Sequence, residues 1–139
     1  MPYLFLLLQL FFAPPPASGT LRFEVAGVER AEGMIWVGLY DSAQHLFVQE
    51  KAIVAGYDVY RAGSVTFDLA DLPYGRYALA IFHDVNNNGT LDQSWIGIPQ
   101  EPYAFAGKPG SKWRKPRFEE IDFEFGHDGQ VVALTLERW

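Results

Sequence analysis

Apolar and polar side chains alternate with a period of two along most of the chain, and this pattern constrains the fold more than any other feature. Leu21, Phe23 and Val25 alternate with polar side chains. The same period returns in three later segments, at 65–69, 76–82 and 121–125. Successive side chains of a β-strand point to opposite faces, so this period is typical of strands with one buried face. No segment repeats apolar residues at helical spacing over three turns, which argues against a long helix.

Further segments complete the prediction of an all-β fold. Residues 34–40 form a continuous apolar run, which is typical of a central strand buried on both faces. Short edge strands are expected over 45–48 and 51–57. The last strand, 131–137, is expected to form a hairpin with 121–125 across a Gly-containing turn. Short strands separated by Gly, Pro and Asp turns predict an antiparallel β-sandwich of about seven strands.

Composition narrows the classes of function. The chain has no Cys, which excludes thiol catalysis, zinc-finger sites and iron–sulfur clusters. It has 17 Asp and Glu against 11 Lys and Arg, a formal net charge of −6. A nucleic-acid-binding protein usually presents a basic face, so we expect no nucleic-acid partner.

The N-terminal residues 1–19 carry no charged side chain. Their apolar run, 3–13, is shorter than the roughly 20 residues that cross a bilayer, and it suits the central region of a secretory signal peptide. Small residues at Ala17 and Gly19 predict cleavage after Gly19. We therefore expect a single mature domain, 20–139, that is periplasmic or secreted and has no transmembrane segment. The alternative is an N-terminal strand of the core.

The most specific motif is a loop of oxygen-bearing side chains directly after a predicted strand. Asp84, Asn86, Asn88 and Asp92 occupy loop positions 1, 3, 5 and 9, and Gly89 occupies position 6. This is the ligand spacing of an EF-hand-type calcium loop, in which alternate side chains converge on one ion. The spacing predicts a Ca²⁺ site.

Two departures from an EF-hand predict that the site is weak. Thr90 would supply the backbone carbonyl of position 7, but position 12 is Trp95 instead of a bidentate Glu. Glu101 is the nearest later carboxylate that could complete the ligand shell. Such a set predicts a dissociation constant of about 10⁻⁴–10⁻³ M. The alternative is a metal-free hairpin turn, because Asn88-Gly89 alone favours a type I′ turn.

The irregular segment 86–117 is longer than a sandwich loop requires, and long loops often carry function. Trp113, Arg114 and Lys115 lie in its basic part. Cations beside an aromatic ring favour a contact site for a partner of the cell envelope or the extracellular space. The alternative is a solvated loop whose cations balance the acidic side chains of 119–122.

The sequence offers little support for catalysis. His83 stands beside Asp84, but a lone His more often bonds a neighbouring carboxylate or carbonyl than it serves as a ligand or base. The sequence has neither a Gly-x-Ser-x-Gly elbow nor a phosphate-binding Gly-rich loop. We therefore expect no catalytic residue and a non-enzymatic domain. One alternative is a ligand-binding protein or enzyme with a pocket formed by His83, Asp84 and Glu101, and another is a purely structural accessory domain.

Three blocks of sequence together resemble a known family. They are Y-A-L-A-I-F-H-D at 77–84, N-x-N-G-x-L-D at 86–92 and G-I-P-x-E-x-Y-x-F at 97–105. They are similar to DUF2141, an uncharacterised family of exported bacterial proteins. The resemblance implies a secreted or periplasmic β-sandwich with an immunoglobulin-like or transthyretin-like arrangement, and it implies no activity. One departure is Ala-Phe-Ala at 104–106, where the family usually has Gly-Phe-Ser.

Overall fold

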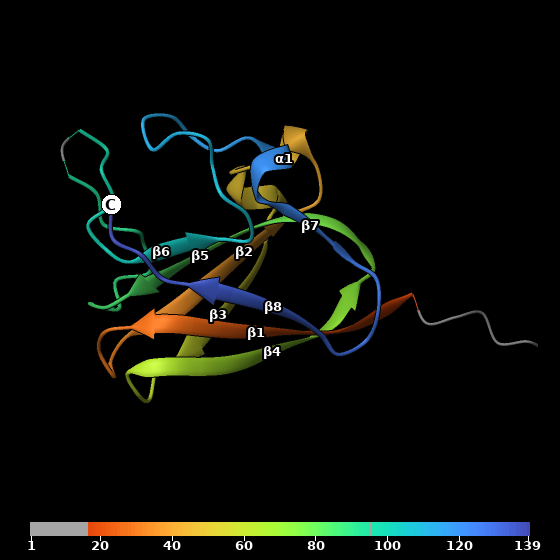
Figure 1. The fold of residues 1–139 in the computed structure, drawn as a ribbon, viewed down its shortest axis with the longest axis horizontal. Coiled ribbons are helices and arrows are strands. Elements are labelled where there is room, and N and C mark those ends of the chain that lie inside the picture. The colour runs from red at the N-terminus through yellow and green to blue at the C-terminus, as the bar shows by residue number, and fades with distance from the viewer. Residues whose placement is uncertain (1–16, 95) are drawn as a thin grey trace, which may run out of the picture.

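A computed structural model describes residues 17–94 and 96–139, so most of the predicted signal peptide and Trp95 lie outside the described residues. The described residues form eight strands (Figure 1): β1 (Ser18–Val28), β2 (Met34–Tyr40), β3 (Ile53–Asp58), β4 (Gly63–Pro73), β5 (Gly75–Asp84), β6 (Tyr103–Phe105), β7 (Asp122–Phe125) and β8 (Gln130–Thr135). Three helical turns accompany them: the 3₁₀ turns η1 (Ala43–His45) and η2 (Gln49–Lys51) and the α-helical turn α1 (Phe118–Ile121). None of the helices in the described ranges is long and apolar enough to cross a membrane.

The strands form two sheets that pack together as layers. One sheet has the order β4-β1-β8, and the other has the order β3-β2-β5-β6, with β7 also paired to β5. The strands in Figure 1 lie in front of and behind a shared interior. This arrangement confirms the predicted all-β sandwich.

The alternating pattern is what fills the core. Leu21, Phe23 and Val25 on β1 are at most 1% exposed, while their polar neighbours Arg22 and Glu24 are exposed. The inward residues of the opposite sheet follow the same alternation on β2 and β5: Ile35, Val37, Leu39, Tyr77, Leu79 and Ile81. Each strand therefore buries one row of apolar side chains between the layers.

The predicted C-terminal hairpin is wrong. β7 pairs antiparallel with β5, matching Tyr77 to Phe123. β8 pairs with β1 in the other sheet, in parallel, matching Leu21 to Gln130. The turn after β7 therefore carries the chain from one sheet to the other, and the sandwich is not purely antiparallel. Alternation along a strand shows which face is buried, but it does not identify the strand that pairs with it.

The predicted strand at 45–48 is also wrong. Ser42 accepts a hydrogen bond from the His45 backbone N–H at its side chain (3.3 Å), and this cap starts the turn η1. Phe47 has a φ of 59°, which a strand does not allow. The neighbouring prediction, 51–57, is confirmed in its main part by β3.

The first described residues belong to the sheet. Ser18 and Gly19 pair with Pro73 and Leu72 of β4, and the Tyr74 backbone N–H donates to the Ala17 carbonyl at 3.0 Å. A cleavage after Gly19 would remove these contacts and leave the rest of β1 in place.

Candidate functional site

The two residues at the end of β5 point to opposite faces of their sheet. His83 pairs with the core residue Ile35 and is 0% exposed, and its Nε2 lies 2.6 Å from the Glu32 carbonyl oxygen. Its Nδ1 is buried with no hydrogen-bond partner. Asp84, the next residue, faces the outer side of the sheet, where the following loop covers it completely. Because neighbouring strand residues alternate, His83 and Asp84 do not share a pocket.

The Asp84 carboxylate organises the loop that follows it. Oδ1 accepts from the backbone N–H of Asn88 at 3.1 Å, and Oδ2 accepts from the backbone N–H of Gly89 at 2.7 Å. Oδ2 also accepts from the indole N–H of Trp36 on β2, at 3.1 Å. A carboxylate has about four acceptor positions, so one position on Oδ1 is left after these three bonds. Asp84 therefore curls residues 85–89 over the sheet.

The remaining oxygen-bearing side chains continue the curl. The Asn86 side-chain oxygen accepts from the Asn88 backbone N–H, and the Asn88 side-chain oxygen accepts from the Thr90 backbone N–H at 3.0 Å. The amide nitrogens of Asn86 and Asn88 both donate to the carboxylate of Asp92. Five of the six predicted metal ligands thus lie in one hydrogen-bonded loop.

Glu101, the sixth predicted ligand, fastens the two ends of this loop. It is 6% exposed, and its Oε1 accepts from the Val85 backbone N–H while its Oε2 accepts from the Asp92 backbone N–H, both at 3.1 Å. One carboxylate therefore closes the loop from the inside. Glu101 is brought to the loop as expected, but His83 is not.

Within the described residues, no group of three or more His, Cys, Asp or Glu side chains is arranged to hold a metal ion. The predicted calcium set depends on amide and carbonyl oxygens as well as on Asp84 and Asp92. In the structure, the Asn86 and Asn88 side chains present nitrogen to Asp92, where a cation would require oxygen. Rotation of these two amides is the change that a bound ion would need.

The loop continues into a short hairpin, which we call the 92–100 hairpin and of which residues 92–94 and 96–100 are described. Asp92 and Gln100 are joined by a backbone hydrogen bond at 2.8 Å, and the Ser94 N–H donates to the Ile98 carbonyl, also at 2.8 Å. Gly97 takes a φ of 83° at the turn. Because the Asp92 N–H is held by Glu101, the 92–100 hairpin is attached directly to the loop 84–92, which we call the fastened loop.

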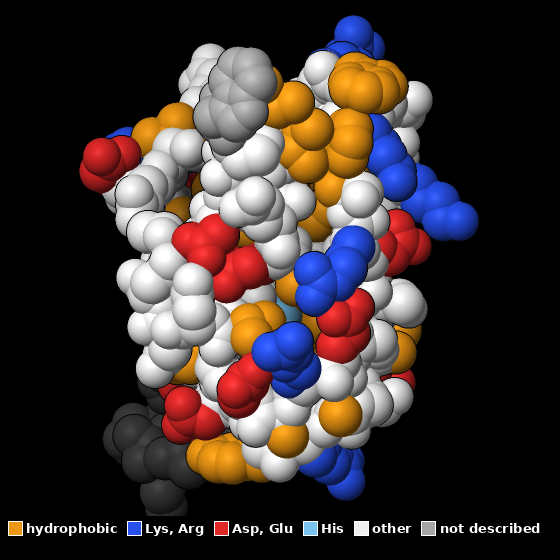
Figure 2. Space-filling view, turned by 90° about the vertical axis from the view of Figure 1, so that its left-hand side faces the viewer, with side chains coloured by type: hydrophobic (Ala, Val, Ile, Leu, Met, Phe, Trp, Pro, Cys, Tyr) orange, Lys and Arg blue, Asp and Glu red, His pale blue; other side chains and the backbone are white. Residues whose placement is uncertain are grey.

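This hairpin forms one wall of a large groove, which we call the aromatic groove. Its volume is about 1070 Å³. Its walls are the 92–100 hairpin, β6, the segment 107–116, the last residues of β8 and the C-terminal Trp139. In Figure 2, hydrophobic side chains gather near the top of the face in view, with Lys and Arg side chains to their right. None of His83, Asp84 and Glu101 lines this groove.

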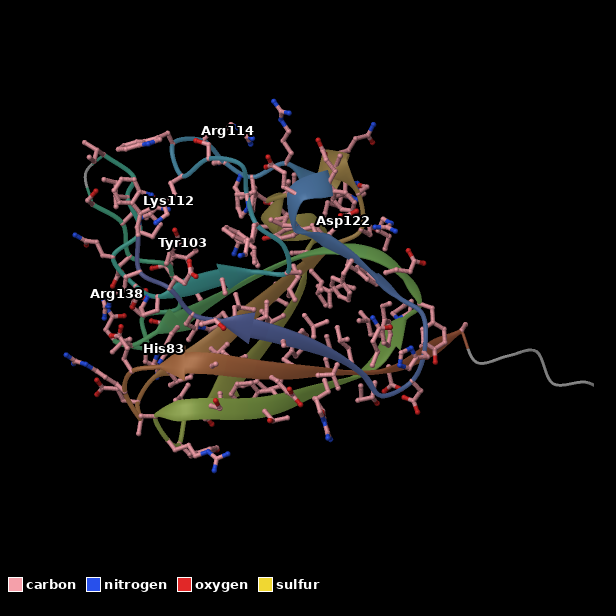
Figure 3. All side chains as sticks on the ribbon, in the orientation of Figure 1. His83, Tyr103, Lys112, Arg114, Asp122 and Arg138 are labelled. Carbon is pink, nitrogen blue, oxygen red and sulfur yellow. The ribbon has the colours of Figure 1, made fainter. Side chains whose placement is uncertain are left out.

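The predicted partner-binding residues belong to the aromatic groove. Trp113 is 83% exposed, and its ring packs edge-on against Trp139 with centroids 5.0 Å apart. Trp139 donates its indole N–H to the Lys112 carbonyl at 3.4 Å, so the C-terminus holds this part of the segment. Arg114 and Lys115 line the same groove. Tyr103, Lys112 and Arg114 come from β6 and the 107–116 segment at one end of the molecule (Figure 3).

Glu120 fixes the shape of the basic segment. Its carboxylate accepts two hydrogen bonds from the Arg114 guanidinium, at 2.9 and 2.6 Å, and one each from the backbone N–H groups of Arg117 and Gly110. The Arg114 guanidinium, followed by these backbone donors, lowers the pKa of Glu120 to about 2. Part of the expected balance between the basic segment and residues 119–122 is therefore a defined ion pair.

Several residues that matter here were not singled out from the sequence. Trp36 holds Asp84, and Trp139 supports Trp113. Glu120, which the sequence offered only as one of the acidic side chains of 119–122, shapes the basic segment. Each contact joins residues from distant parts of the chain or from an irregular loop, where no periodic pattern exists.

Comparison with known proteins gives one finding about identity. The family described as "Uncharacterized protein conserved in bacteria (DUF2141)" matches residues 23–133, which are most of the chain. No protein of curated function and no solved structure gave a significant match. The matched range includes the fastened loop, the 92–100 hairpin and most of the aromatic groove. The chain therefore belongs to the DUF2141 family of bacterial proteins.

Proposed function

We propose that this chain is an exported, non-enzymatic binding domain. In this proposal the aromatic groove takes up a partner of the cell envelope or the extracellular space. The 84–92 loop binds one Ca²⁺ ion and holds one wall of that groove. The observation that carries the proposal is the double contact of Glu101, which fastens Val85 and Asp92 and so joins the loop to the groove.

The route from loop to groove is short and continuous. Glu101 holds the Asp92 N–H, and Asp92 is bonded through its carbonyl to Gln100 at the base of the 92–100 hairpin. Ile96 and Ile98 of that hairpin line the groove, and Ile96 is 58% exposed. A change in the order of the loop would therefore reach the groove through covalent and hydrogen-bonded neighbours.

The chemistry of the loop supports an ion of the calcium type. Asp84 and Asp92 would supply carboxylate oxygens, Asn86 and Asn88 amide oxygens, and Thr90 its backbone carbonyl. Ca²⁺ accepts six to eight oxygen ligands in an irregular shell, whereas Mg²⁺ prefers a regular octahedron and retains water. Glu101 already accepts two backbone N–H groups, and it would act by closing the loop around the ion.

The buried carboxylates support a role in binding more than one in catalysis. Asp84 and Glu101 accept five hydrogen bonds from protein donors between them, so both serve to hold the backbone. His83 faces the core on the other side of the sheet. A single pocket that uses all three side chains is not favoured by this arrangement.

Thermal unfolding with and without Ca²⁺ tests the proposal. With a dissociation constant of about 10⁻⁴ M, 1 mM Ca²⁺ should add about 1.4 kcal/mol to the free energy of unfolding. For a domain of this size, that corresponds to a rise of about 5 °C in the melting temperature over a sample with chelator. Mg²⁺ at the same concentration should give a smaller rise.

Two variants locate the effect. Asp92→Asn keeps the size of the side chain but removes its charge, and it should abolish most of the Ca²⁺-dependent rise. Asp58→Asn is the matched control, because Asp58 is an exposed carboxylate outside the loop and should leave the rise unchanged. An equal rise in both variants, or no rise at about 10 mM Ca²⁺, would refute the calcium site and reduce the loop to a hydrogen-bonded turn.

Export is tested separately by N-terminal sequencing of the protein recovered from its native host. We expect Thr20 as the first residue, because residues 1–19 have the pattern of a signal peptide. A product that still begins at Met1 or Pro2 would contradict export by this route.

A further inference from the structure

The aromatic groove lies between β6 of one sheet and β8 of the other, next to the point at which their backbones are hydrogen-bonded. Tyr103 on β6 and Glu137, just after β8, exchange two backbone hydrogen bonds of 2.9 Å each. If this antiparallel ladder continued, the next bonded pair would be Phe105 and Thr135. The two strands diverge instead (Figure 1), and the groove occupies the space between them.

The backbone of β6 turns toward this space groups that have no hydrogen-bond partner in the described part of the chain. His83 N–H donates to the Pro102 carbonyl, and Ala106 N–H donates to the Leu79 carbonyl. These bonds identify the even-numbered residues of β6 as those that face β5. Because backbone groups alternate along a strand, the N–H and C=O of Phe105 point away from β5 and into the groove.

The same reasoning applies to β8. Leu136 N–H donates to the Ala26 carbonyl of β1, so the even-numbered residues face β1. The N–H and C=O groups of Val131, Ala133 and Thr135 therefore point away from the sheet. All three residues are exposed, and Ala133 and Thr135 line the groove. Among the described residues, none bonds to these outward backbone groups, so the outer edge of β8 is an open row of hydrogen-bond donors and acceptors.

The edge of β8 lacks the features that usually protect an edge strand. Proteins commonly block such edges with charged side chains, proline or an irregular backbone. The opposite edge strand, β4, carries Asp68 and Asp71, ends at Pro73, and has a positive φ at Asp71. Residues 130–135 of β8 carry no charge and no proline. An uncharged edge beside a groove lined in part by aromatic side chains suits the addition of another strand.

Charge indicates the chemistry of the strand that would be added. Lys108, Lys112 and Lys115 line the groove, and none of them has an ion-pair partner among the residues that the structure describes. Among the described residues that line the groove, Glu137 is the only acidic one. The protein as a whole carries a net charge of −6, so this face is a local basic region on an acidic molecule. Such a field attracts carboxylates to the groove and repels them elsewhere.

We propose that the aromatic groove binds an extended acidic segment of a partner polypeptide, which pairs as an added strand with the outer edge of β8. This inference rests on the proposed role of the groove as a partner site, and it names the chemistry of the partner. Backbone pairing with Ala133 and Thr135 supplies the affinity. The lysines bind the carboxylates, and Trp113 packs against an apolar side chain of the segment.

The test uses random peptides displayed on phage, long enough to span β8, selected on the immobilised protein. Enriched peptides should carry net negative charge and an aromatic or aliphatic residue. Ala133→Pro removes one outward N–H without touching the bonds to β1, and it should weaken binding of the enriched peptides by about tenfold or more. Ala133→Thr retains the N–H and is the matched control, with a change within about twofold.

Two further measurements keep the test independent of folding defects. N-methylation of alternate backbone nitrogens in an enriched peptide removes the same hydrogen bonds from the ligand. The methyl groups can be placed on either of the two alternating sets of nitrogens, and one of the two methylated peptides should no longer bind the unaltered protein. The double variant Lys112→Glu/Lys115→Glu changes only exposed side chains and should weaken binding by about fivefold at low salt.

The outcomes separate this inference from the calcium site. No enriched peptide, or equal binding to Ala133→Pro and Ala133→Thr, overturns strand addition. Binding of oligogalacturonate or of anionic lipid vesicles, unchanged in Ala133→Pro, would also overturn it in favour of a glycan or membrane ligand. A Ca²⁺-dependent rise in melting temperature without enriched peptides refutes only the strand. Enriched peptides without such a rise refute only the calcium site.

Discussion

Replacing Asp84 by Ala should strongly destabilise the fold, even though the residue lies at the end of a strand beside an exposed loop. The carboxylate is 0% exposed and accepts hydrogen bonds from Asn88, Gly89 and the indole of Trp36. Asp84→Ala removes all three acceptor contacts at once. The experiment is done with chelator present, so that the effect on folding is measured apart from any ion.

The expected magnitude follows from the three donors. A hydrogen bond to a charged group contributes about 1.5–3 kcal/mol. The N–H groups of Asn88 and Gly89 lie in an exposed loop and can bond to water after the substitution, so the loss of each of these two bonds should cost only about 1 kcal/mol, below that range. The Trp36 N–H is part-buried and cannot be solvated as easily. We therefore expect a loss of about 3–4 kcal/mol in the free energy of unfolding.

Urea unfolding and thermal melts measure this loss. For a domain of about 120 residues, 3–4 kcal/mol corresponds to a fall of roughly 12–16 °C in the melting temperature. Trp36→Phe removes the indole donor together with part of the ring, and it should cost at least about 1 kcal/mol. Because the two residues are in contact, the double variant should cost less than the sum of the single variants. A loss below about 1 kcal/mol for Asp84→Ala, or strict additivity, would refute the view that this carboxylate organises the loop.

Two further predictions follow from the same structure. The pKa of Glu120, held at about 2 by Arg114, lies below its unfolded value of 4.5, so the carboxylate stabilises the fold fully above pH 4.5 and progressively less down to pH 2. The difference in urea stability between the unaltered protein and Glu120→Gln should therefore shrink as the pH falls through this window. A difference that grows would contradict the ion pair. Gly33→Ala should cost more than about 3 kcal/mol, because a Cβ there would lie 2.0 Å from the Asp84 carbonyl oxygen. Gly63→Ala, also at positive φ but with open space around it, should cost only about 1 kcal/mol in the same urea titration, and equal costs would show that the contact with Asp84 is unimportant.

The position of the loop motif was readable from the sequence, but the roles of its residues were only partly so. Spacing placed Asp84, Asn86, Asn88 and Asp92 in one curled loop, and the structure brings them together. Glu101 was predicted as one more ligand, but in the structure its carboxylate accepts hydrogen bonds from the backbone N–H groups of Val85 and Asp92. A spacing pattern identifies which oxygens can approach one another, whereas the donors that they bond depend on how the chain folds back over the sheet.

His83 and Asp84 illustrate the same limit at a single pair of residues. Their adjacency suggested a shared pocket, but a strand sends neighbouring side chains to opposite faces. The strand itself was predicted correctly over 76–82, and the alternation that predicted it also separates the two side chains. His83 is buried because it faces the core, whereas Asp84 is buried because the following loop covers it.

The alternation of apolar and polar residues was enough to locate most strands and the side of each that faces the core. This information is local, because a period of two requires only that one face be apolar. Tertiary structure alone decided that β8 leaves β7 to pair in parallel with β1, and that an open edge and a groove remain between β6 and β8. The pairing of strands depends on which strand edges are still free when the two sheets pack together, and this is decided by contacts between residues far apart in the chain.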